Sequence, residues 1–142
     1  MASPTTFMEW VVFLLHKYLS FFLQGCEITL VLALVGTLLG CVIGLLVGVL
    51  RTIPAPRKKA NPVIKVLYRL MQFILLAYIE IFRGTPMMVQ AMVVYYGSMQ
   101  VFNLNMSPMF AGFLVVSINT GAYMAETVRG GIESIDAGQT EA

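Results

Sequence analysis

The sequence predicts an all-α membrane protein with three transmembrane helices plus an interfacial helix. Of its 142 residues, 58% are hydrophobic and only 11% are charged, and the mean hydropathy is +0.83. A soluble domain carries about 25% charged residues, so this chain has too few polar groups to cover a water-facing surface. Its apolar runs are separated by short breaks that contain proline. Together these observations place the chain in a bilayer.

Residues 1–24 form an aromatic-rich segment, which we expect to lie at the membrane interface and lead into the first span. Trp10 and Tyr18 are of the types that gather at headgroup level, and Glu9 interrupts the apolar run early. The segment lacks the basic start and small-residue cleavage site of a signal peptide. The lone histidine, His16, has no partner at ligand spacing, so we interpret it as an interfacial side chain.

Residues 26–50 form the first predicted span, because about 20 apolar residues cross the hydrocarbon core as a helix. Glycines recur there at every fourth position, at Gly36, Gly40, Gly44 and Gly48. This spacing leaves one helix face without side chains, so that another backbone can approach closely. The face serves either a second subunit or packing within the same chain, and we favour the second reading.

Basic residues gather directly after this span, at Arg51, Arg57, Lys58, Lys59, Lys65 and Arg69. No acidic residue lies between Glu27 and Glu80. Clustered Lys and Arg beside a span mark the cytoplasmic side. A nucleic-acid surface would need more charge and interleaved aromatic residues, so we expect no nucleic-acid partner.

Three capping residues followed by proline mark helix starts, at Asn61-Pro62, Thr85-Pro86 and Ser107-Pro108. The segment 62–83 carries its polar residues in one stripe: Lys65, Arg69, Gln72, Glu80 and Arg83. A helix with a single polar stripe is interfacial or packs that stripe into protein. The segment 86–102 is almost wholly apolar.

The number of times the chain crosses the bilayer decides on which side each loop lies. If 62–83 and 86–102 both crossed the bilayer, the acidic C-terminal stretch would lie outside. If 62–83 instead lies along or dips into the cytoplasmic interface, Arg69 and Arg83 stay near water and avoid an insertion cost of about 2.5–3.5 kcal/mol each. We therefore expect three spans, the second ending near Phe102, with the N-terminus outside and the C-terminus inside.

The last span carries Asn119, Tyr123 and Glu126 on one helix face, because they are four and three residues apart. Polar residues inside a membrane mark pathways by default, so these three are the candidate substrate pathway. The alternatives are interhelical hydrogen bonding for Asn119 and a structural ion pair for Glu126. Arg129 and Glu133 follow at spacings that allow an ion-pair ladder with Glu126.

No catalytic constellation is recognisable in the sequence. It contains no Walker A loop, nucleophile elbow, HExxH motif or paired Cys/His ligand spacing. We therefore expect no catalytic residue, no metal site and no cofactor in this chain. Any energy from ATP must come from a separate polypeptide.

Two blocks of sequence resemble the polar amino-acid ABC transporter permeases of the histidine/glutamine/glutamate type. The first runs from Tyr78 to Gln90 (YIEIFRGTPMMVQ) and the second from Asn119 to Ala142 (NTGAYMAETVRGGIESIDAGQTEA). The family signature falls on Glu80, Arg83, Gly84, Thr85, Pro86 and Gln90. The resemblance covers roughly residues 25–142.

The resemblance implies a transmembrane domain over 25–142 that forms an N-terminal portion of a five-helix permease core, incomplete at its C-terminus within the cytoplasmic EAA loop. That loop would couple the permease to an ATPase through Glu133, Gly138, Gln139, Glu141 and Ala142. The implied partners are an ATP-binding subunit carrying ATP and Mg, a second permease subunit in a homo- or heterodimer, and an extracytoplasmic amino-acid-binding protein. The implied location is a bacterial inner membrane, with lipid around a multi-pass chain.

The function implied is an ATP-driven importer subunit for polar amino acids, which is a transporter and not itself an enzyme. The alternative is a non-transporting membrane scaffold or a fragment of a secondary transporter. A secondary transporter has no use for an ATPase partner, so dependence on ATP distinguishes these readings.

Overall fold

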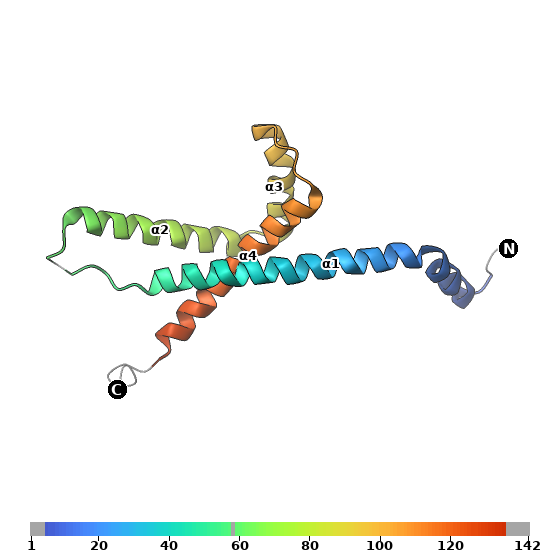
Figure 1. Cartoon of the computed structure of the whole chain (residues 1–142), viewed down its shortest axis with the longest axis horizontal. Helices are drawn as coiled ribbons and strands as arrows, with labels where there is room; N and C mark the ends of the chain where they lie inside the picture. The colour runs from blue at the N-terminus through green and yellow to red at the C-terminus, as the bar shows by residue number, and fades with distance from the viewer. Residues whose placement is uncertain (1–4, 58, 136–142) are drawn as a thin grey trace.

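The computed structural model describes residues 5–57 and 59–135, and every regular element within them is an α-helix. The four helices are α1 (Phe7–Thr52), α2 (Pro62–Gly84), α3 (Met87–Phe102) and α4 (Pro108–Glu133). Figure 1 shows α1 as a long rod that α4 crosses, with α2 beside one half of α1 and α3 turned steeply away from it.

Two of the three predicted helix starts have the expected cap. The Asn61 side chain accepts a hydrogen bond from the backbone N–H of Val63, and the Ser107 hydroxyl accepts one from Phe110. Each cap is followed by proline in the first turn, where its missing N–H costs nothing. The third start differs, because α3 begins after Pro86 and the Thr85 hydroxyl donates back to the Ile81 carbonyl at 2.8 Å.

The glycine stripe of α1 packs against α4 of the same chain. A Cβ placed on Gly36 would lie 2.6 Å from Val116 Cγ1, and one on Gly48 would lie 2.7 Å from Val128 Cβ. Gly40 faces Thr120 in the same way. Because only glycine allows this approach, the stripe serves packing within the chain, as favoured from the sequence.

The contacts between α1 and α4 advance in the same direction, from Gly36 against Val116 to Gly48 against Val128. The two helices are therefore parallel. Had α1, α2 and α3 each crossed a membrane fully, α4 would run opposite to α1. The parallel packing excludes four full crossings and leaves α2 and α3 to return the chain between the two ends of α1.

The return path is divided between α2 and α3. Beside the C-terminal end of α1, the Tyr68 hydroxyl donates to the Ile53 carbonyl at 2.9 Å and Gln72 Nε2 donates to the Leu50 carbonyl at 3.0 Å. Further along α2, the Tyr78 hydroxyl donates to the Ile118 carbonyl of α4 at 2.6 Å. The helix then breaks, and α3 continues along the N-terminal half of α4.

The break between α2 and α3 lies beside the middle of α4. Asn119, which contacts it, is 11 residues from Pro108 in a helix of 26 residues. At 1.5 Å per residue this is about 17 Å along a helix of about 39 Å. The break thus lies beside the middle of α4, whereas from the sequence we expected Arg83 and the break near the interface. The break needs no water, because polar side chains satisfy its backbone.

Three helices are long and apolar enough to cross a membrane, which confirms the predicted number of spans. Their identities differ from the prediction, because they are α1, α2 and α4. The 16 residues of α3 extend only about 24 Å, short of a hydrocarbon core of about 30 Å. The segment predicted as interfacial thus supplies the longer part of the return path, and the segment predicted as a span supplies the shorter.

α1 is much longer than a membrane is thick. Its 46 residues extend about 69 Å, and residues 14–31 are exposed along their whole length. The predicted boundary between residues 24 and 25 coincides with no interruption of the helix. Figure 1 nevertheless shows the darkest blue part of α1, nearest the N-terminus, turning away from the axis of the rest.

Candidate functional site

A cluster of polar side chains closes the break between α2 and α3. Gln90, in the first turn of α3, is only 8% exposed. Its Nε2 donates to the carbonyl of Phe82 at 3.0 Å, the carbonyl of Thr85 at 3.0 Å and the Thr85 hydroxyl at 2.8 Å. The last carbonyls of a helix have no partner within it. Gln90 donates hydrogen bonds to those carbonyls, so the helix can be interrupted here without water as a partner.

Asn119 ties this break to α4. Its Nδ2 donates to the Phe82 carbonyl at 3.0 Å and to Gln90 Oε1 at 3.3 Å. One amide thus contacts the end of α2 and the start of α3 together. Interhelical hydrogen bonding, one of the two readings of Asn119 from the sequence, is present in the structure.

An exposed cation lies next to the cluster. The Arg83 guanidinium lies over the ring of Tyr123, 5.4 Å from the ring centroid. Tyr123 is 51% exposed and comes from α4, one helical turn beyond Asn119. The stack holds a positive charge on the outside of the helices at about half the length of α4. A cation at that depth needs water or a polar partner on its open side.

The expected ion-pair ladder is present at the C-terminal end of α4. Arg129 pairs with Glu126 one turn before it, and its Nη1 lies 2.8 Å from Glu133 Oε2 one turn after it. Arg51 at the end of α1 and Arg83 at the end of α2 also attract the Glu126 carboxylate. Glu126 therefore lies where basic groups of three helices converge.

The remaining predicted residues fall into three groups. Gly84, Thr85 and Pro86 form the break itself, while Glu80 is exposed on α2. Glu133 is the last residue of α4. The other residues predicted to couple to an ATPase lie outside the described residues: Gly138, Gln139, Glu141 and Ala142.

The described parts of the chain contain no group of three or more His, Cys, Asp or Glu residues that could hold a metal ion. The polar groups at the break are instead amides, a hydroxyl, a guanidinium and a phenol. Such groups recognise a small polar or zwitterionic molecule through hydrogen bonds and charge.

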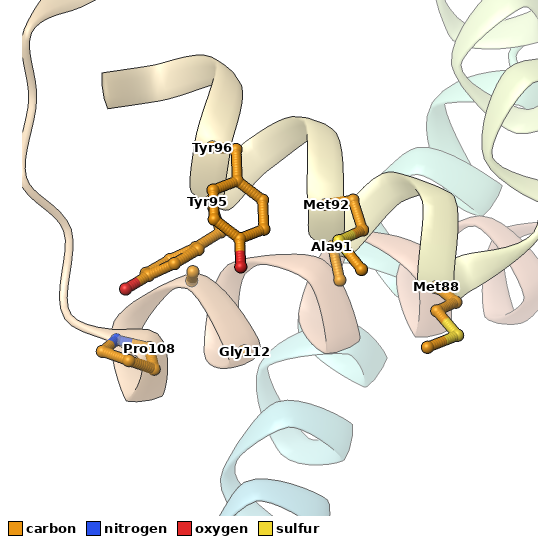
Figure 2. A pocket seen from close by; sticks show the side chains of 8 residues that line it. Met88, Ala91, Met92, Tyr95, Tyr96, Pro108 and Gly112 are labelled. Carbon is orange, nitrogen blue, oxygen red and sulfur yellow. The ribbon is translucent and has the colours of Figure 1, made fainter. Parts of the chain in front are cut away.

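An apolar cavity of about 280 Å³ lies between α3 and the start of α4. Figure 2 shows Tyr95 and Tyr96 at one end, Met88 at the other, and Pro108 and Gly112 across from them on α4. The cavity walls are almost wholly apolar. A polar ligand would lose its hydration there without replacement, so the polar cluster at the break is the better candidate site.

The sequence reasoning singled out Asn119 and Tyr123 but missed their partners. It assigned Gln90 only to the family signature, and it expected Arg83 at the interface. A signal was available, because a lone amide in an apolar helix needs a hydrogen-bond partner. Gln90 and Asn119 are such amides in neighbouring apolar segments, so each was a candidate hydrogen-bond partner of the other.

The comparisons with known proteins agree with the resemblance seen in the motifs. No protein-family model matches the chain. It is similar to the arginine transport system permease protein ArtQ of Bacillus subtilis, with 42% identity over 65 residues, which cover 46% of this chain and 30% of ArtQ. It is also similar to the nopaline transport system permease protein NocM of Agrobacterium fabrum, with 36% identity over 83 residues, which cover 52% of this chain and 34% of NocM.

A solved structure extends the likeness to nearly the whole chain. The crystal structure of an amino acid ABC transporter with histidines superposes with a TM-score of 0.74 and 30% sequence identity, covering 98% of this chain and 56% of that chain. This chain thus spans little more than half of the solved relative. The matches confirm the resemblance to amino-acid ABC transporter permeases and the all-α membrane fold.

Proposed function

We propose that this chain contributes to the permease subunit of an ATP-driven importer for polar amino acids, in a bacterial inner membrane. The observation that carries the proposal is the broken helix α2–α3, which places hydrogen-bonding groups and a cation halfway along α4. Secondary transporters build substrate sites from discontinuous helices near the middle of the bilayer, and we extend that geometry to this chain. The similarity to permeases for arginine and nopaline supports an amino-acid-like substrate.

The substrate route would run past the exposed stack of Arg83 and Tyr123. These groups face away from the packed helices, whereas Gln90 is buried and Asn119 is half-buried. We assign Tyr123 to the route and Asn119 to a double role, as support for the break and as part of its polar lining. Glu126 lies one turn beyond Tyr123, paired with Arg129. It would form the end of the route nearer the C-terminus.

Coupling to ATP hydrolysis would involve the residues that follow α4. The C-terminal ends of α1 and α4 lie together because the two helices are parallel, and Arg51, Arg57 and Lys59 follow the end of α1. Clustered basic residues favour the cytoplasmic side for this end. A separate ATP-binding subunit would dock there on the EAA loop, while a second permease subunit and an extracytoplasmic binding protein complete the importer.

Amino-acid uptake into membrane vesicles tests the route. The chain is expressed with an ATP-binding subunit of an amino-acid ABC transporter, and uptake of labelled arginine, histidine and glutamine is measured with and without ATP. The substitution Tyr123→Ala removes the ring under Arg83, whose cation–π contact is worth about 0.5–1 kcal/mol at an exposed site. It also removes a side chain that we assign to the route, so uptake should fall severalfold. Phe73→Ala, an exposed aromatic truncation on α2, is the control and should change nothing.

Equal uptake by the Tyr123→Ala protein and the parent would remove Tyr123 from the route. Uptake that persists without ATP but follows an ion gradient would favour the secondary transporter. No uptake of any amino acid by the parent, with the ATP-binding subunit bound, would favour the scaffold. For coupling, Glu141→Lys should reduce co-purification of the ATP-binding subunit, and unchanged association would contradict that assignment.

A further inference from the structure

The N-terminal part of α1 extends beyond the packed helices. Leu32 is the residue of α1 that contacts Gly112, near the start of α4. Because the two helices are parallel, Pro108 lies at about the level of Ile28. Residues 7–27 therefore continue for about 31 Å past the beginning of α4. This stretch is too long to be an extension of the same span.

This stretch also has a polar stripe. Its uncharged and charged polar residues recur at steps of seven, four, four and three, which keeps them on one helix face: Glu9, His16, Ser20, Gln24 and Glu27. The opposite face carries large apolar side chains, among them Val11, Leu15, Tyr18 and Phe22. A narrow polar stripe on an apolar helix is typical of a helix that lies in the plane of the interface.

Neither bulk water nor the bilayer core is a favourable environment for this stretch. Phe7, Leu15 and Phe22 are all exposed, and projection into water would leave them hydrated. Continuing straight through lipid is excluded by length, since the whole helix extends about 69 Å against a core of about 30 Å. The turn near the N-terminus of α1 in Figure 1 already starts to redirect the helix.

We infer that in the membrane α1 bends between residue 24 and its packed part, so that residues 7–24 lie along the membrane surface on the side where α4 begins, with the polar stripe toward water and the apolar face among lipid acyl chains. The occupant of the apolar face is lipid. The stripe carries Glu9 and Glu27, with Lys17 as the only neighbouring basic side chain. Helices that recruit anionic lipid are rich in Lys and Arg, so this one fits zwitterionic headgroups. The inference does not depend on the substrate or on an ATPase.

The chain contains a single tryptophan, Trp10, which reports on this segment alone. The protein is reconstituted into phosphatidylcholine vesicles that carry bromine either near the headgroup end or near the methyl end of the acyl chains. We expect Trp10 fluorescence to be quenched severalfold more by the shallow bromines. Adding phosphatidylglycerol should leave the quenching unchanged.

Two substitutions that add the same charge on opposite faces provide the matched comparison. Leu15→Lys enters the apolar face and should reduce quenching by shallow bromines severalfold, while raising quenching by aqueous acrylamide. Ser20→Lys enters the polar stripe and should leave both unchanged. Both positions are exposed and contact no other helix, so neither change disturbs the packed part of the fold.

Four results would contradict the inference, three of them its placement of the segment and one its choice of lipid. Stronger quenching by the deep bromines would place the segment across the bilayer. Acrylamide quenching without bromine quenching would place it in water. Protection from both quenchers would mean that a protein, a second copy included, covers the apolar face. An increase in quenching with phosphatidylglycerol would refute the assignment to zwitterionic headgroups.

Discussion

The substitution Gly40→Ala tests the packing of α1 on α4. A Cβ at position 40 would lie 2.6 Å from Thr120 Cβ and 3.0 Å from the Ser117 carbonyl oxygen. Ordinary contacts of this kind are 3.4–4 Å. The helices must therefore separate by about 1 Å, and dispersion contacts are lost along the whole seam. Overpacking of this kind costs about 1–3 kcal/mol.

Alanine also favours the helix over glycine by about 1 kcal/mol, which offsets part of that cost. Gly25→Ala isolates the offset, because Gly25 lies in the same helix and a Cβ there would have no neighbour within 4 Å. The difference between the two variants is the packing contribution. We expect Gly40→Ala to lower the free energy of unfolding by about 1–3 kcal/mol relative to Gly25→Ala.

The assay is reversible unfolding in mixed detergent micelles, with helix content followed by circular dichroism. Equal free energies for the two variants would refute the in-chain packing. If the stripe were instead a face between subunits, Gly40→Ala would change the oligomeric state and leave the unfolding of the single chain unaffected. Cross-linking at low protein concentration separates these outcomes.

Two further predictions use the same unfolding assay. Gln90→Leu leaves the Thr85 carbonyl without its side-chain donor and removes one acceptor of the Asn119 amide, while the Phe82 carbonyl keeps its bond from Asn119. Since an unsatisfied buried group costs about 1–3 kcal/mol, we expect a loss in that range. The control Gln100→Leu, at an exposed position of α3, should be neutral, and equal effects would contradict the role of Gln90. Tyr78→Phe removes the hydrogen bond to the Ile118 carbonyl and should lower the free energy of unfolding by about 1 kcal/mol. An unchanged free energy would mean that water replaces the hydroxyl.

Features set by neighbouring residues were predictable from the sequence. The starts of α2 and α4 depend on Asn61 and Ser107, whose caps reach only two or three residues along the chain. The ladder around Arg129 likewise lies within two turns of one helix. These patterns depend only on residues close in the chain, so no knowledge of the tertiary fold was needed, although the same pattern at Thr85-Pro86 gave no cap.

Features that depend on contacts between distant segments were not predictable from the sequence. The position of the break depends on Asn119, which bonds to Phe82 from 37 residues away and to Gln90 from 29 residues away. The expectation that Arg83 stays at an interface rested on the cost of inserting its charge into the bilayer, and it did not consider what satisfies the backbone at the end of α2. Side chains of α3 and α4 satisfy it instead, and no local pattern shows how those helices are placed. The glycine stripe predicted close packing against another helix, but it did not identify that helix as α4.

The parallel pairing of α1 and α4 also sets an order of events during synthesis. Each glycine of the stripe in α1 meets a residue 80 positions later in the chain, as Gly48 meets Val128. A ribosome adds about 5–20 residues per second, so the glycine face of α1 waits about 4–16 s in the membrane before its partner is made. During that interval lipid, or the helix of another nascent chain, occupies the seam. When α4 emerges it must displace that occupant, so a slower rate of translation through α2 and α3 prolongs the time in which the wrong neighbour can bind.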